Sequence, residues 1–154
     1  MIIVAGAVIL VWAYFNYAFI PVAKSTAGIQ RAHRAISDGQ FQQAHNLLNT
    51  AAKDDSLSPA ALSLNGRLYL HHFELTQSRN RDLLAGAEDG LLEAISRNSA
   101  DFKNFEKLTV VYDNFAKLTA QGKDDWLEKA YNSAKEAIKR YPGSGRLRIE
   151  LAKI

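Results

Sequence analysis

The sequence predicts an all-α protein in which one apolar N-terminal helix precedes a solenoid of about three helical hairpins and a truncated terminal helix. The first observation is a period of 43 residues. Two sets of alanines recur at this interval, namely Ala44, Ala87 and Ala130, and Ala51, Ala94 and Ala137. The second observation is that apolar stripes at helical spacing alternate with turn-forming residues. A fixed period of this length is typical of stacked helical hairpins, each of which buries its apolar face against its neighbours.

Composition limits the classes of function. Of the 154 residues, 47% are hydrophobic and 23% are charged, which is enough apolar material for a packed core. The absence of Cys excludes a disulfide framework and a zinc knuckle. The net charge is +3, but the basic residues are scattered among acidic ones. We therefore expect no nucleic-acid partner, since such a surface needs a basic stripe.

The apolar opening predicts a transmembrane helix. Residues 2–20 contain one strongly polar residue, Asn16, and as a helix they would rise about 28 Å. Pro21 and Lys24 mark the predicted end of this segment, which we place at residues 1–23. A signal peptide would begin with basic residues, and a buried core helix would carry more polar ones. The lipid bilayer is thus the expected environment of this segment.

Topology is ambiguous on the sequence alone. Lys24, Arg31 and Arg34 follow the apolar segment, and the positive-inside rule taken alone puts the repeats in the cytoplasm. Transmembrane helices upstream would overrule this bias. The chain starts within an apolar run and its last helical pattern stops after about two turns. We expect a piece of a longer protein, although Met1 as the true start remains open.

Helix-breaking residues divide the remainder of the chain, residues 25–154, into pairs of helices. Gly39 ends the first helix and Pro142 the sixth, while Ser58, Asp124 and Ser144 are predicted N-caps. The predicted helices are 26–37, 41–53, 58–76, 82–97, 99–120 and a sixth from 124, followed by a short terminal helix.

Small residues at repeated positions indicate where the helices of a pair cross. Alanines seven residues apart lie on one helix face and allow close approach of the neighbouring helix. The predicted repeat-packing positions are Ala44, Ala51, Gly66, Tyr69, Ala87, Ala94, Tyr112, Ala130, Ala137 and Pro142.

These spacings resemble the tetratricopeptide repeat, whose pattern is Trp-x2-Leu-Gly-x2-Tyr and then Ala-x3-Phe-x2-Ala-x4-Pro. Leu62-x3-Gly66-x2-Tyr69 follows the first half, and Ala87-x3-Leu91-x2-Ala94 follows the second. The unit here is longer than the family's repeat of about 34 residues. The resemblance implies a scaffold that binds a protein or peptide partner in the groove lined by the first helix of each pair.

The layout of an apolar helix followed by such repeats also resembles the C-terminal end of bacterial O-antigen ligase or polymerase-like membrane proteins. The segments Asn65-Gly-Arg-Leu-Tyr69 and Tyr141-Pro-Gly-Ser-Gly-Arg-Leu147 carry this resemblance. It implies a non-catalytic tail in the bacterial inner membrane, with the glycan-transfer site in another part of the parent protein. The alternative is an independent single-pass adaptor of an envelope assembly or translocation complex. We expect no enzyme activity in this chain.

The spacing places a set of polar side chains on the predicted binding face. These candidate residues are Ser63, Arg67, His71, Lys103, Glu106 and Asp113. Because the face mixes both charges, recognition of a carboxylate tail is disfavoured, and Arg67 has Glu106 or Asp113 as an alternative partner across neighbouring repeats. No metal or cofactor is expected: His71 and Glu74 share a face, but two ligands do not make a metal site.

Overall fold

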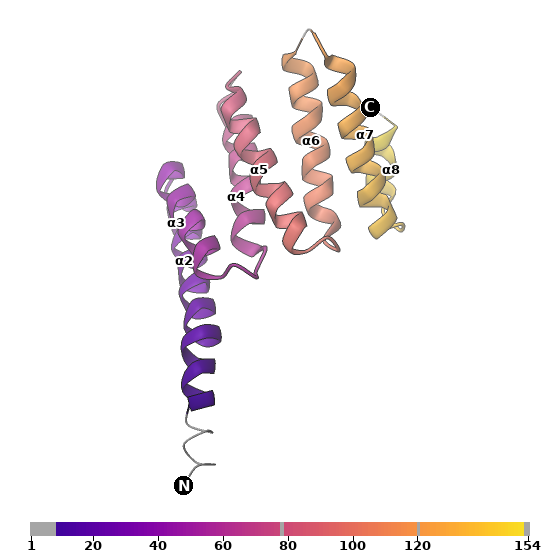
Figure 1. Cartoon of the computed structure of the whole chain (residues 1–154). Coiled ribbons are helices and arrows are strands. Elements are labelled where there is room, and N and C mark those ends of the chain that lie inside the picture. The colour runs from indigo at the N-terminus through magenta and orange to yellow at the C-terminus, as the bar shows by residue number, and fades with distance from the viewer. Residues whose placement is uncertain (1–8, 78, 120, 153–154) are drawn as a thin grey trace. The chain divides into compact units, whose positions relative to one another are not determined.

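The computed structural model describes residues 9–77, 79–119 and 121–152, and every regular element in these ranges is helical. The elements are η1 (Phe15–Phe19), α2 (Ile20–Ser37), α3 (Phe41–Asp54), α4 (Ala60–Leu75), α5 (Arg81–Arg97), α6 (Phe102–Leu118), α7 (Lys123–Arg140) and α8 (Gly145–Leu151) (Figure 1). The chain forms two compact units, residues 1–61 and residues 62–154. Each unit is described by itself.

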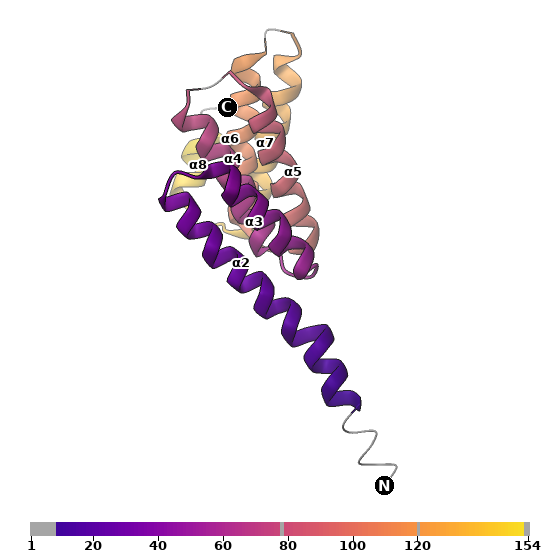
Figure 2. The same ribbon diagram turned by 90° about the vertical axis from the view of Figure 1, so that its left-hand side faces the viewer.

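The first helix of unit 1 continues through Pro21, the residue predicted to mark the end of the membrane segment. Residues 9–37 are helical without a break (Figure 2), and residues 15–19 within them form a π-helical turn. The Ile20 N–H donates to the Phe15 carbonyl, five residues back. Pro21 has no N–H to donate and its ring crowds the preceding turn, so a widened turn just before it keeps the helix continuous. The helix predicted to begin at residue 26 is therefore part of a longer helix.

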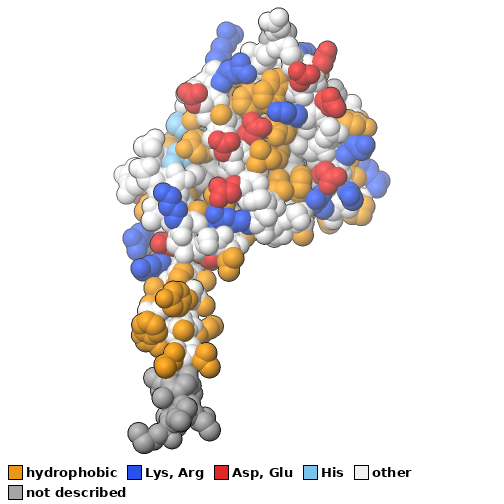
Figure 3. All heavy atoms as spheres, in the orientation of Figure 1, with side chains coloured by type: hydrophobic (Ala, Val, Ile, Leu, Met, Phe, Trp, Pro, Cys, Tyr) orange, Lys and Arg blue, Asp and Glu red, His pale blue; other side chains and the backbone are white. Residues whose placement is uncertain are grey.

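Apolar side chains cover the N-terminal part of this helix. The exposed large residues here are Ile9, Leu10, Val11, Trp12, Tyr14, Phe15, Tyr17, Phe19 and Val22 (Figure 3). Within the described ranges, no helix has both the length and the apolar character required to cross a membrane. Residues 2–8 of the predicted transmembrane segment lie outside the described residues. The membrane anchor stays a prediction.

The rest of unit 1 is a hairpin of α2 and α3. Gly39 adopts a left-handed φ of 71° in the turn, as predicted from its place after the first helix. The two helices approach closely: a Cβ on Gly28 would lie 3.0 Å from the Cβ of Ala51. Ala44 and Leu48 of α3 are fully buried.

In unit 2, α4 and α5 cross at two glycines. A Cβ on Gly66 would lie 3.0 Å from the carbonyl oxygen of Ala87, and one on Gly90 would lie 3.1 Å from the Cα of Gly66. The helices are therefore close enough for backbone to meet backbone. Leu91 of α5 fills the space beside Gly66 and is fully buried.

A continuous apolar core joins these helices to α6 and α7. It contains Leu70, Phe73, Leu84, Ala87, Leu91, Leu108, Val111, Tyr112, Phe115 and Ala130. Trp126 of α7 packs on this core by stacking on Phe115, with ring centroids 4.4 Å apart. Burial raises the pKa of the Tyr112 hydroxyl above 10.0, and both the charge of Glu88 and a hydrogen bond to its carboxylate act in the same direction.

Side-chain caps fix several helix ends. Asp101 caps α6 by accepting from the Lys103 N–H, and Ser144 caps α8 by accepting from the Leu147 N–H, as predicted for Ser144. The predicted cap of α7 was wrong, because that helix begins at Lys123 after Gly122, which has a φ of +75°. Asp124 lies instead in the first turn, where its charge complements the helix dipole.

The predicted repeat-packing positions occupy the helix contacts with the exception of Pro142. Ala44, Ala51, Gly66, Ala87, Ala94, Tyr112, Ala130 and Ala137 are buried. Tyr69 is half-buried, and its ring packs on α5, since a Cβ on Gly86 would lie 3.1 Å from three of its ring atoms. Pro142 is exposed just beyond the end of α7.

Candidate functional site

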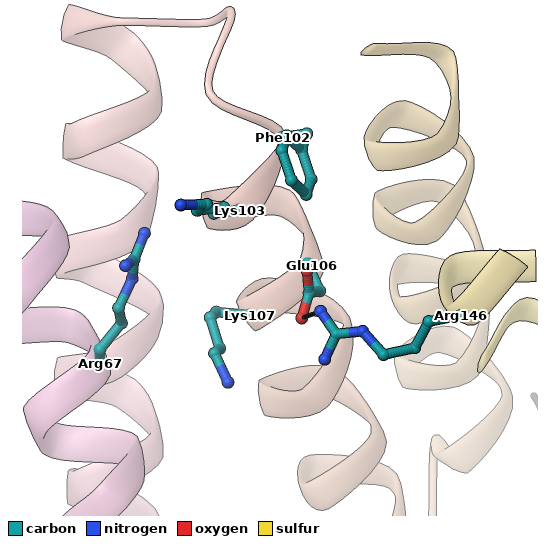
Figure 4. Close-up of a pocket in the computed structure, with 6 residues that line it drawn as sticks. All are labelled: Arg67, Phe102, Lys103, Glu106, Lys107 and Arg146. Carbon is teal, nitrogen blue, oxygen red and sulfur yellow. Dashed lines mark hydrogen bonds and ion pairs between the residues drawn. The ribbon is translucent and has the colours of Figure 1, made fainter. Parts of the chain in front are cut away.

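A pocket of about 240 Å³ lies in unit 2 between helices that each come first in a predicted pair. Its lining residues are Arg67 of α4, Phe102, Lys103, Glu106 and Lys107 of α6, and Arg146 of α8 (Figure 4). Helices α5 and α7, the second members of their pairs, contribute none of these residues. We call this surface the first-helix face. Four of its six side chains are cationic.

Three of these cations are gathered on the α4 side of the pocket. Lys103 and Lys107 extend from α6 toward that side, and Arg67 reaches toward Lys103 from α4 (Figure 4). Arg67 approaches the carboxylate of Asp101 only to 3.8 Å, and both side chains are about one third exposed. Among the described residues, the ammonium groups of Lys103 and Lys107 form no ion pair. This side of the pocket therefore carries net positive charge from the two lysines, beside the long Arg67–Asp101 pair.

A buried amide holds Arg67 in place. Asn104 is fully buried, and its Oδ1 accepts from the Ser63 hydroxyl at 2.6 Å and from Nη2 of Arg67 at 3.2 Å. Its Nδ2 has no hydrogen-bond partner within the described part of the chain. A side chain fixed by a buried hydrogen bond loses less conformational freedom when a ligand binds. Arg67 is thus oriented before any ligand arrives.

The opposite side of the pocket holds an ion pair between two helices. Glu106 of α6 accepts a charge-assisted hydrogen bond from Arg146 of α8 (Figure 4). The side chain of Glu106 is 7% exposed whereas that of Arg146 is 65% exposed, so the pair lies at the rim of the pocket. The single carboxylate that lines the pocket is therefore already matched with a cation.

The structure brings three of the six predicted site residues together. Arg67, Lys103 and Glu106 line the pocket, and Ser63 supports it through Asn104. His71 is exposed on α4 outside the lining.

The remaining candidate, Asp113, pairs with Lys117 on its own helix. The alternative in which Arg67 pairs with Glu106 or Asp113 is not what the structure shows, since both carboxylates pair with other cations.

Three lining residues escaped the sequence analysis, although the sequence held a signal for two of them. Arg146 follows Lys103 by 43 residues, so the repeat itself places it at the equivalent position of the next unit. Lys107 follows Lys103 by four residues and therefore shares its helix face. Phe102 begins α6, and its ring stacks on Tyr141, a contact that no spacing indicated.

The described residues contain no group of three or more His, Cys, Asp or Glu side chains placed to hold a metal ion. The pocket is suited instead to binding anionic groups. Four cationic side chains and one aromatic ring line it, and its one carboxylate, that of Glu106, is paired with Arg146.

Comparisons with known proteins identify the fold. No protein-family model matches the sequence, and no curated protein matches it. Solved structures do match. The first tetratricopeptide domain of Spaghetti (RPAP3), bound to the HSP90 peptide SRMEEVD, is 15% identical with a TM-score of 0.68, covering 86% of this chain and 90% of that one.

Two further structures agree with this match. The second tetratricopeptide domain of human RPAP3, in complex with the HSP70 peptide SGPTIEEVD, is 16% identical with a TM-score of 0.69 and coverages of 86% and 96%. The structure of MamA is 18% identical with a TM-score of 0.67 and coverages of 90% and 69%. The chain therefore has a tetratricopeptide-like fold of helical repeats. The resemblance predicted from the sequence is confirmed at the level of the fold.

Proposed function

We propose that this chain is a scaffold whose first-helix face binds an acidic segment of a partner protein. The observation that carries the proposal is the pocket in which Arg67, Lys103 and Lys107 present positive charge to one small volume. The acidic residues predicted on the same face do not neutralise these cations, because Glu106 and Asp113 are paired elsewhere. The peptides bound to the two similar RPAP3 domains also contain acidic residues. The proposed role is binding and not catalysis.

A display library of random peptides, selected on the purified chain, tests this function. We expect the enriched peptides to be acidic, and to lose binding to a Lys103→Gln/Lys107→Gln variant. A Lys123→Gln/Lys139→Gln variant has the same net charge, and both of its substitutions lie at exposed positions on α7. It should bind the enriched peptides like the parent. Enrichment of neutral or basic peptides would contradict the proposal.

We further propose that the N-terminal apolar segment anchors this scaffold in a membrane. Support comes from the apolar run of residues 2–20 and from the exposed apolar side chains of residues 9–22. Flotation with liposomes tests this: the full chain should float, and a chain lacking residues 1–23 should stay at the bottom of the gradient. Equal behaviour of the two chains would exclude the anchor.

The bacterial inner membrane and a parent resembling an O-antigen ligase or polymerase remain the proposed context, and an independent single-pass adaptor is the alternative. An antibody against the repeats distinguishes them in source membranes. A band several times larger than 17.1 kDa would favour the tail of a polytopic protein. A band at that mass would favour the adaptor.

A further inference from the structure

The two lysines of the pocket are arranged as a pair along the axis of α6. Lys103 and Lys107 are four residues apart, and both extend toward the α4 side of the pocket (Figure 4). Four residues of α-helix rise about 6 Å, so the two side chains leave the helix one turn apart. Neither ammonium group forms an ion pair within the described residues. The pocket therefore presents two positive centres in a row.

An extended peptide has a matching period on each of its faces. Side chains at alternate positions share a face and are separated by roughly 6.6–6.8 Å, because each residue advances about 3.3–3.4 Å. Side chains at adjacent positions point to opposite faces. Two acidic side chains separated by one residue would thus meet both lysines, whereas two adjacent ones would present one carboxylate to the pocket and one away from it.

The other lining residues favour the α4 side as the position of such a peptide. Arg67 faces Lys103 there, is oriented by its hydrogen bond to Asn104, and forms only a long ion pair of 3.8 Å with Asp101. A carboxylate placed near Lys103 would accept a hydrogen bond from this guanidinium as well. Hydrogen bonds between two charged groups are stronger than those between neutral groups. On the α8 side, the carboxylate of Glu106 already holds Arg146 and would repel a second carboxylate.

We propose that the pocket selects an extended partner segment with two acidic side chains at alternate positions, one paired with Lys103 and Arg67 and the other with Lys107. This inference rests on the proposed function, and it adds a spacing rule to it. The rule concerns side chains within the segment and does not require the carboxylate at the end of a chain.

Three synthetic peptides test the spacing rule on the full chain in detergent micelles. All have acetylated and amidated ends, which removes terminal charge. The first contains two Glu separated by one Ser, the second contains the same two Glu side by side, and the third has Gln in place of both Glu. The first should bind at least fivefold more tightly than the second, and the third should not bind measurably at low ionic strength.

Two single-residue variants test whether Lys107 causes the preference for the peptide with alternate Glu residues. Lys107→Gln should weaken the alternate peptide until the two acidic peptides differ by less than twofold, while Lys123→Gln should leave the difference unchanged. Equal binding of both acidic peptides to the parent chain would overturn the spacing rule but leave the proposed function intact. Failure of both acidic peptides to bind would overturn the proposed function as well.

Discussion

The substitution Gly66→Ala tests the close crossing of α4 and α5. The new Cβ would lie 2.8 Å from Cγ of Leu91, and 3.0 Å from both the Ala87 carbonyl oxygen and the Leu91 amide nitrogen. Two of these three neighbours are backbone atoms, which cannot move without separating the helices. Leu91 is fully buried, so a change of its rotamer would have to displace close-packed neighbours.

Two effects of opposite sign determine how much Gly66→Ala changes the free energy of unfolding. Overpacking a well-packed contact costs about 1–3 kcal/mol, and the rigid backbone neighbours favour the upper end of that range. Ala has a higher helix propensity than Gly by about 1 kcal/mol, which offsets part of the cost. The free energy of unfolding of unit 2 should therefore fall by about 2 kcal/mol.

Urea unfolding followed by tryptophan fluorescence measures this loss. The chain has two Trp, so a Trp12→Phe background leaves Trp126, which stacks on Phe115 in the core of unit 2. Gly145→Ala is the matched control, since a Cβ there meets nothing within 4 Å, and it should not lower stability. A Gly66→Ala protein as stable as its parent would refute the close crossing.

The neighbouring glycine provides a second test of the same geometry. A Cβ on Gly90 would lie 3.1 Å from the backbone nitrogen and Cα of Gly66, so both substitutions strain one contact. Once the first has separated the helices, the second should cost less. The double variant should be more stable than additivity predicts by at least about 0.5 kcal/mol. Strict additivity would mean that the two glycines lie in independent contacts.

Three further predictions follow from other contacts of unit 2. The raised pKa of Tyr112 favours the folded state below pH 10.0, and this contribution to stability is lost as pH rises and the unfolded phenol ionises. Between pH 9.5 and 11.5, Tyr112→Phe should therefore lose less unfolding free energy than the parent chain. An identical loss in both proteins would show that Tyr112 does not cause it. Leu147 is 1% exposed in α8, so Leu147→Ala should lower the free energy of unfolding by about 2–4 kcal/mol and speed amide hydrogen exchange in α8. Unchanged exchange in α8 would show that this side chain does not stabilise the helix. Glu106→Gln removes the carboxylate that lines the pocket and frees Arg146. An acidic peptide should then bind more tightly by on the order of 1 kcal/mol, about fivefold, as measured by calorimetry. Weaker binding would contradict the proposed electrostatics of the pocket.

The fold could be predicted largely from the sequence because small residues recur where helices must approach. Ala87, Ala94, Ala130 and Ala137 are fully buried or nearly so. The continuous helix through Pro21 could not be predicted, because a widened turn absorbs the missing hydrogen bond and no residue type signals it. The start of α7 could not be predicted either, because Gly122 occupies the N-cap position that the sequence pattern assigned to Asp124.

The candidate site could be predicted in part, for a different reason. Helical spacing assigns a residue to a face, and three residues that it put on one face, Arg67, Lys103 and Glu106, line one pocket. It does not say which opposite charges meet. The short helix α8 carries Arg146 to Glu106, so that a cation from another helix, and not Arg67, pairs with this carboxylate. The partner of each charge depends on tertiary packing, which periodicity does not encode.

The central claim is that the first helices of unit 2 bind an acidic peptide segment. Backbone amide shifts in the nuclear magnetic resonance spectrum, recorded while the alternate-Glu peptide is titrated into the isotope-labelled chain, test it most directly. The account predicts saturable shifts concentrated at residues 63–71, 101–110 and 144–148, on α4, α6 and α8. Shifts centred on α5 or α7, or no saturable shift at all, would contradict it.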